Sequence, residues 1–107
     1  MDYLKQAEQA IQYLSDSEDS YASLKATHQA EKERLKITEA ACVLASDLKT
    51  VKDREMQAKT TTAYSEALEQ WQQVMEEFYL IEAKRKRAEL IIEMYRSVNS
   101  ALKRGNI

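Results

Sequence analysis

The strongest chemical signal in the sequence is a run of four consecutive cations, Lys84 to Arg87. Such side chains bind phosphate groups, and the rings of Tyr79 and Tyr95 are near enough in sequence to stack on a base. Residues 82–104 hold seven lysines and arginines against three glutamates, a net charge of +4. Since the whole chain carries −2, the remainder carries −6. This asymmetry predicts an anionic partner for the basic segment or head-to-tail contact between subunits.

The four cations do not all face one partner, because four consecutive residues of a helix span about 300° of arc. Lys84 and Arg87 are three residues apart and share a face. Arg85 falls among apolar positions, where it either extends its head into water or contacts an acidic residue of a partner helix. For the others, the alternative to phosphate binding is a solvated face paired with nearby glutamates. The candidate nucleic-acid contacts here are Lys84, Arg85, Lys86, Arg87 and Arg96.

His28 and Cys42 are the remaining side chains with catalytic or metal-binding chemistry. On one helix, fourteen residues separate them by about 21 Å, too far for a nucleophile and its base. A metal site needs three or four ligands, and each of these residues stands alone. The sequence has no glycine-rich phosphate loop and no helical His-Glu metal motif. We therefore expect no enzyme, with no catalytic residues, no metal and no cofactor.

The elements that position these residues are predicted to be helices. The sequence has no proline and a single glycine, Gly105, so it lacks the turn residues that sheet folds need. Good helix formers dominate its 107 residues. The start of the chain has no signal-peptide pattern, and no apolar run approaches the ~20 residues of a membrane span. With one cysteine as well, these features lead us to expect a cytoplasmic protein with no membrane contact.

A long helix is predicted at about residues 62–104. Two rows of mostly apolar residues repeat every seven positions and interleave as the a and d positions of a coiled coil do. One helix cannot bury this stripe alone, so a second helix from the same or another chain must cover it. Its aromatic residues are interpreted as core rather than as a platform for a ligand. The predicted core or oligomer-interface residues are Tyr64, Trp71, Val74, Phe78, Ile81, Ile92, Tyr95 and Leu102.

Two helices are predicted before this one, a short one at 2–14 and a long one at about 20–48. The break falls at Ser15 to Ser20, because Ser and Asp side chains compete for backbone hydrogen bonds. The next turn lies at 47–53 or at 60–62. The prediction is a single all-α domain, residues 1–107, built as a long antiparallel helical hairpin with a short N-terminal helix. Its coiled-coil-like core is narrow, which predicts a homo-oligomer.

This layout resembles the small helical proteins of bacteriophage recombination modules, and most of all the UvsY family of recombination mediators. The similarity covers about residues 20–97. It is one of order and spacing, carried by a charged helix (Tyr21 to Ala45), a mixed-charge segment (Asp47 to Met56), and a long helix that opens with Tyr64, Trp71 and Phe78 and closes with Ile91 to Arg96.

The resemblance implies an all-helical, ring-forming protein that binds single-stranded DNA. Such a protein helps to load a RecA-like recombinase in place of a single-strand binding protein, in the host cell cytoplasm if phage-encoded. The family's basic DNA contacts lie mid-chain, which implies Lys49, Lys52 and Arg54 here. Because acidic residues lie among these three, the cluster from Lys84 to Arg87 stays an equal candidate. Two alternatives remain open: a helical adaptor or inhibitor that binds a protein, and a structural coiled-coil element.

Overall fold

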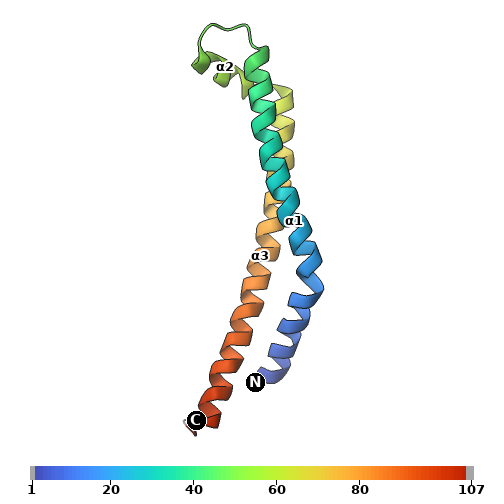
Figure 1. Cartoon of the computed structure of the whole chain (residues 1–107), viewed down its shortest axis with the longest axis vertical. Coiled ribbons are helices and arrows are strands. Elements are labelled where there is room, and N and C mark those ends of the chain that lie inside the picture. Colours follow the sequence, from blue (N-terminus) through green and yellow to red (C-terminus); the bar gives the residue numbers. More distant parts are fainter. Residues whose placement is uncertain (1, 106–107) are drawn as a thin grey trace. The chain divides into compact units, whose positions relative to one another are not determined.

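The computed structural model describes residues 2–105, and within that range it has three helices and no strand. Helix α1 runs from Tyr3 to Ala45, α2 from Val51 to Ala58 and α3 from Thr62 to Lys103 (Figure 1). Contacts between α1 and α3 join early residues of one helix to late residues of the other, so the two helices are antiparallel. The predicted all-α fold with a long helical hairpin is confirmed.

The chain predicted as one domain forms two compact units. The terminal unit joins the start of α1, up to Ala22, to the end of α3, from Tyr79 onward. The turn unit holds residues 23–78, which include α2. Each unit contains a paired segment of α1 and α3.

The heptad stripe of α3 is turned toward α1 in both units. Val74 and Phe78 are only 8% and 6% exposed, which confirms the core interpretation for these two residues. Leu102 departs from the pattern, with 54% of its surface exposed. The half-buried members of the stripe are Tyr64, Trp71, Ile81, Arg85, Ile92 and Tyr95.

The predicted break at Ser15 to Ser20 is wrong, and so is the separate short helix before it. Helix α1 passes through this segment without interruption. The Ser17 hydroxyl donates to the Tyr13 carbonyl one turn earlier at 2.7 Å, and the Gln12 amide donates to the Asp16 carboxylate at 2.8 Å. These polar groups are therefore satisfied inside a helix rather than in a turn. Contact with α3 supplies the rest of the stabilisation, because tertiary packing overrides weak local preferences.

The two turns that the sequence offered as alternatives both occur, at 46–50 and 59–61, and between them lies α2, a helix that the sequence analysis did not predict. Helix α1 ends at Ala45, three residues before the predicted end. Thr50 caps α2 by accepting a hydrogen bond from the Asp53 amide, and Thr61 caps α3 by accepting one from the Tyr64 amide. The predicted start of the long helix is confirmed. Its end is confirmed as well, because Gly105 follows with a φ of 70°, the left-handed conformation of a C-terminal cap.

Alanine dominates the core of this fold. Among the described residues, the hydrophobic side chains that are buried belong to five alanines, one valine and one phenylalanine. None of the helices described carries an apolar stretch long enough to cross a lipid bilayer. Half-buried large side chains, among them Trp71, Ile81 and Ile92, surround these buried residues.

Candidate nucleic-acid interface

Arg85 is engaged by α1 inside the terminal unit. Its Nη1 donates to the Leu14 carbonyl at 2.9 Å and to the Ser17 hydroxyl at 2.8 Å. Its Cζ lies 4.8 Å from the centre of the Tyr21 ring, a cation–π contact. The sequence predicted that the Arg85 guanidinium either extends into water or contacts an acidic residue of a partner helix. Neither is found, because the guanidinium contacts α1 and its partners there are neutral. Arg85 therefore joins the two helices and is not offered to a ligand.

Lys86 and Arg96 lie among acidic side chains. Lys86 Nζ is 3.5 Å from a Glu82 carboxylate oxygen one turn earlier, an exposed pair of the kind that contributes about 0.3–0.5 kcal/mol. Arg96 shares a small surface groove with Glu89 and Glu93. The predicted alternative of local pairing thus holds for Lys86, and Arg96 has two carboxylates nearby that reduce its attraction for phosphate.

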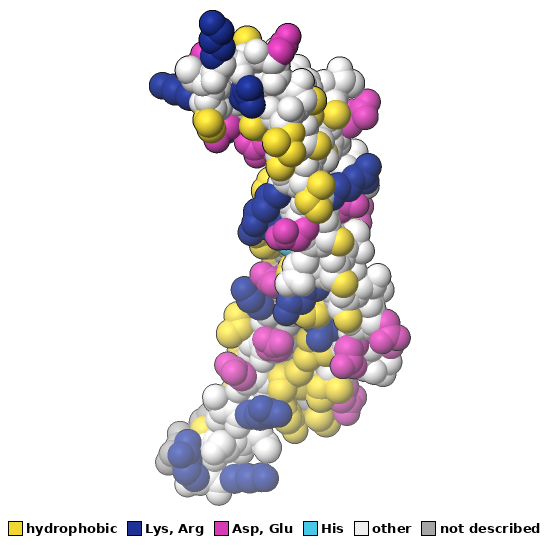
Figure 2. Space-filling view, turned by 45° about the horizontal axis from the view of Figure 1, so that its top comes forward, with side chains coloured by type: hydrophobic (Ala, Val, Ile, Leu, Met, Phe, Trp, Pro, Cys, Tyr) yellow, Lys and Arg dark blue, Asp and Glu magenta, His cyan; other side chains and the backbone are white. Residues whose placement is uncertain are grey.

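Lys84 and Arg87 lie along a larger groove of the terminal unit, with a volume of about 790 Å³. Both side chains belong to exposed residues of α3. From α1 the groove receives two half-buried tyrosines, Tyr3 and Tyr13. We call this feature the terminal groove; its other lining residues are Gln6, Gln9, Ala10, Ala88, Ile91 and Met94. Figure 2 shows hydrophobic side chains gathered in the lower half of the view, with Lys and Arg side chains around them.

The two tyrosines of this groove differ from those suggested by the sequence. Tyr79 and Tyr95 were the predicted stacking residues, yet neither lines the terminal groove. Sequence reasoning missed Tyr3 and Tyr13 because it separated the start of α1 from the rest of that helix, whereas the continuous α1 brings both tyrosines to the groove lined by residues 84–94 of α3.

The mid-chain cations are dispersed. Arg54 is half-buried, and its Nε donates to the Leu48 carbonyl, which ties it to the turn before α2. Lys49 and Lys52 are exposed. Figure 2 shows the Lys and Arg side chains at the α2 end standing apart from one another. Of the two predicted basic sites, the later one has the better-formed surface.

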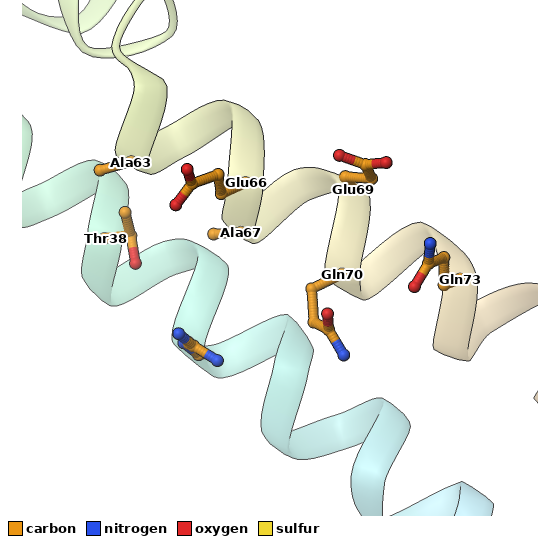
Figure 3. A pocket seen from close by; sticks show the side chains of 8 residues that line it. Thr38, Ala63, Glu66, Ala67, Glu69, Gln70 and Gln73 are labelled. Carbon is orange, nitrogen blue, oxygen red and sulfur yellow. The ribbon is translucent and has the colours of Figure 1, made fainter.

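A second groove, in the turn unit, is polar. It has a volume of about 530 Å³ and is lined from α1 by Arg34 and Thr38. In Figure 3 the Gln70 side chain points toward α1, whereas Glu69 points away from it. In the same view the carboxylates of Glu66 and Glu69 point in different directions. Within residues 2–105, no group of three or more side chains is placed to hold a metal ion.

His28 and Cys42 belong to the helix packing of the turn unit. The His28 ring stacks on Phe78 with 5.1 Å between ring centroids, and on Trp71 with 6.2 Å. Cys42 Sγ lies 3.4 Å from the Thr61 hydroxyl oxygen, next to the cap of α3. His28 thus contacts α3 and Cys42 contacts its cap, at two separate places in the turn unit.

Comparison of this chain with protein families, curated proteins and solved structures finds no match. The terminal groove combines an apolar floor, two aromatic rings and two exposed cations within one unit.

Proposed function

We propose that this protein binds single-stranded DNA through the terminal groove and acts as an accessory protein without enzymatic activity. The observation that supports this most is the placement of Lys84 and Arg87 along an apolar groove that also holds Tyr3 and Tyr13. Proteins that bind single strands combine cations for the backbone with aromatic rings for the bases. The terminal groove has both.

Single strands fit this groove better than a duplex. The faces of unpaired bases are free to lie on tyrosine rings and on the apolar side chains of Ile91 and Met94. Duplex bases are stacked on each other, so they leave those side chains without a partner. The resemblance to the UvsY mediators extends the proposal to recombination, with assistance to a RecA-like recombinase as the role, and an oligomer as the acting form.

The test is fluorescence anisotropy of a labelled, unstructured oligonucleotide over a range of salt concentrations. We expect binding that tolerates changes of sequence and weakens as salt rises, because each phosphate contact releases condensed counterions. The double variant K84E/R87E removes both groove cations. It is expected to weaken binding and to lower the slope of log K against log salt by about 1.4, at about 0.7 per contact.

The matched control is K49E/K52E, which makes the same charge change in the mid-chain segment. Circular dichroism checks that both variants keep their helices. Loss of binding in K49E/K52E alone would move the site to the mid-chain segment. A wild-type protein that binds no oligonucleotide at low salt overturns the proposal.

A second candidate is the adaptor, and the floor of the terminal groove favours it. Ala10, Ala88, Ile91 and Met94 offer an apolar surface onto which an amphipathic helix with acidic flanks would fit. Binding of such a peptide, without binding of oligonucleotides, is the result that distinguishes this function from the first.

A further inference from the structure

The charged side chains of the terminal groove lie together at one of its ends. Lys84 and Arg87 are charged, and the other residues that line the groove are not. Arg85, which lies between them in the sequence, donates to the Ser17 hydroxyl on α1. The two cations therefore lie at the end of the groove that Tyr13 forms.

The opposite end of the groove carries no charge. On α3, Met94 lies seven residues beyond Arg87, about 10 Å farther along the helix axis. On α1, Tyr3 lies ten residues before Tyr13, about 15 Å away along the axis. Because the two helices are antiparallel, Met94 and Tyr3 belong to the same end of the groove. A strand that ran the whole length of the groove would have phosphates beside uncharged side chains.

The charges of Lys84 and Arg87 are available to a ligand. Both residues are exposed, and none of the ion pairs found within residues 2–105 includes either of them. Spaced three residues apart, they share one face of α3. A group with two negative charges matches such a pair. A phosphate monoester carries about −1.5 to −2 at pH 7, whereas each diester inside a strand carries a single charge.

A carboxylate lies past the cationic end of the groove. Asp16 follows Gln9 by seven residues, so it lies on nearly the same side of α1 as that lining residue. The Asp16 side chain is exposed and accepts a hydrogen bond from the Gln12 amide at 2.8 Å. A strand that continued past the cations would bring its next phosphate toward this carboxylate, and like charges repel. This end of the groove therefore suits the end of a strand better than its middle.

We propose that the terminal groove binds the phosphorylated end of a single strand. The terminal phosphate lies between Lys84 and Arg87, and the first bases lie along the apolar floor from Tyr13 to Tyr3. At the ~3.4 Å rise of stacked nucleotides, the ~15 Å between the two tyrosines holds about four of them. This inference rests on the proposed function, because it names the part of single-stranded DNA that occupies the same groove.

Titration calorimetry of the full chain with short thymidylates at low salt tests the proposal. The probes are tetrathymidylates with a 5′-phosphate, with a 3′-phosphate, and with hydroxyl groups at both ends. Hydroxyl-ended hexathymidylate is the control, because its diesters carry about the same total charge as a phosphate-ended tetrathymidylate. We expect one phosphate-ended probe to bind at least about tenfold more tightly than this control, since its second charge gains a charge-assisted hydrogen bond. The end that gives this gain shows the direction of the strand.

Three variants locate the effect. K84E/R87E is expected to lose the preference for a terminal phosphate. Asp16→Asn removes the carboxylate beyond the cations and is expected to raise the affinity for hexathymidylate, which reduces the preference. Glu8→Gln is the matched control, since Glu8 is an exposed residue of α1 outside the groove, and it is expected to leave the preference unchanged. Circular dichroism checks that all three variants keep their helices.

Equal binding of hexathymidylate and both phosphate-ended probes would overturn this inference. So would a preference that persists in K84E/R87E or is undiminished in Asp16→Asn. Dodecyl phosphate that binds as tightly as the phosphate-ended strand would overturn it as well, by assigning the groove to an amphiphilic phosphate. Failure of the proposed function has a different readout, because a long hydroxyl-ended oligonucleotide would then show no binding by fluorescence anisotropy.

Discussion

The guanidinium of Arg85 on α3 lies against the ring of Tyr21 on α1, with 4.8 Å from Cζ to the ring centre. Arg85 occupies a heptad position that would otherwise hold an apolar residue, and Ser17 faces it from the opposite helix. Polar groups at such positions fix the register of paired helices, because any shift leaves them without partners. This contact therefore favours the register in which the start of α1 opposes the basic segment of α3, the pairing that forms the terminal groove.

Replacing Arg85 and Tyr21 by alanine, singly and together, measures this contact. We expect Arg85→Ala to lower the free energy of unfolding by about 1–3 kcal/mol, since it removes two hydrogen bonds from a charged donor. The double-mutant cycle is expected to give a coupling energy of about 0.5–1 kcal/mol for the cation–π pair. Urea denaturation provides all four values. A coupling energy of zero would mean that the two side chains are neighbours without interacting.

Proline at Glu18 tests the continuity of α1. Glu18 is exposed and lies in the middle of the segment that the sequence suggests is a break. In a continuous helix, Glu18→Pro removes a backbone hydrogen bond and clashes with the preceding turn, at a cost of about 3 kcal/mol or more. Thermal unfolding is the measurement, with Glu18→Ala as the control that keeps the helix. A proline variant as stable as the control would show that α1 is interrupted at Ser15 to Ser20, as the sequence suggested.

The stacking of Phe78 and Trp71 on His28 in the turn unit predicts how much unfolding free energy is lost when a core side chain is shortened. Phe78 is 6% exposed and stacks on His28, so Phe78→Ala is expected to cost about 3–5 kcal/mol. Leu80, two residues later, is exposed, and Leu80→Ala is expected to cost less than about 0.5 kcal/mol. The two variants are compared by chemical denaturation under one set of conditions. Equal losses of unfolding free energy in the two variants would show that α3 turns a different face toward α1.

We expect the tyrosines of the terminal groove to strengthen DNA binding by stacking on bases, independently of charge. Tyr13→Ala is expected to weaken oligonucleotide binding by about 1–3 kcal/mol, the usual contribution of one stacked base, with no change in the salt slope. Tyr13→Phe keeps the ring and is expected to bind as the wild type does. Tyr95→Ala is the comparison, since Tyr95 lies outside this groove. A loss confined to Tyr95→Ala would support the aromatic residue first suggested by the sequence.

The fold could be predicted from the sequence wherever periodicity is strong. The rows through Val74 and Phe78 located the buried face of α3, and Gly105 located its end. Composition alone misplaced the break in α1, because Ser17 forms its hydrogen bonds within the helix and to α3. Only the cations of the terminal groove could be predicted, since Tyr3 and Tyr13 line one groove with Lys84 and Arg87 through the pairing of two segments far apart in the chain. Arg85 joins the two helices at this pairing through neutral partners that no charge pattern reveals.

The alanine core has a thermodynamic consequence. The heat capacity change of unfolding follows the apolar area that becomes exposed, and buried alanines such as Ala7, Ala67 and Ala88 expose little of it. For a single chain it is therefore expected to fall below the usual ~12–15 cal/mol/K per residue. A smaller heat capacity change flattens the stability curve, so the free energy of unfolding varies gently between cold and warm conditions.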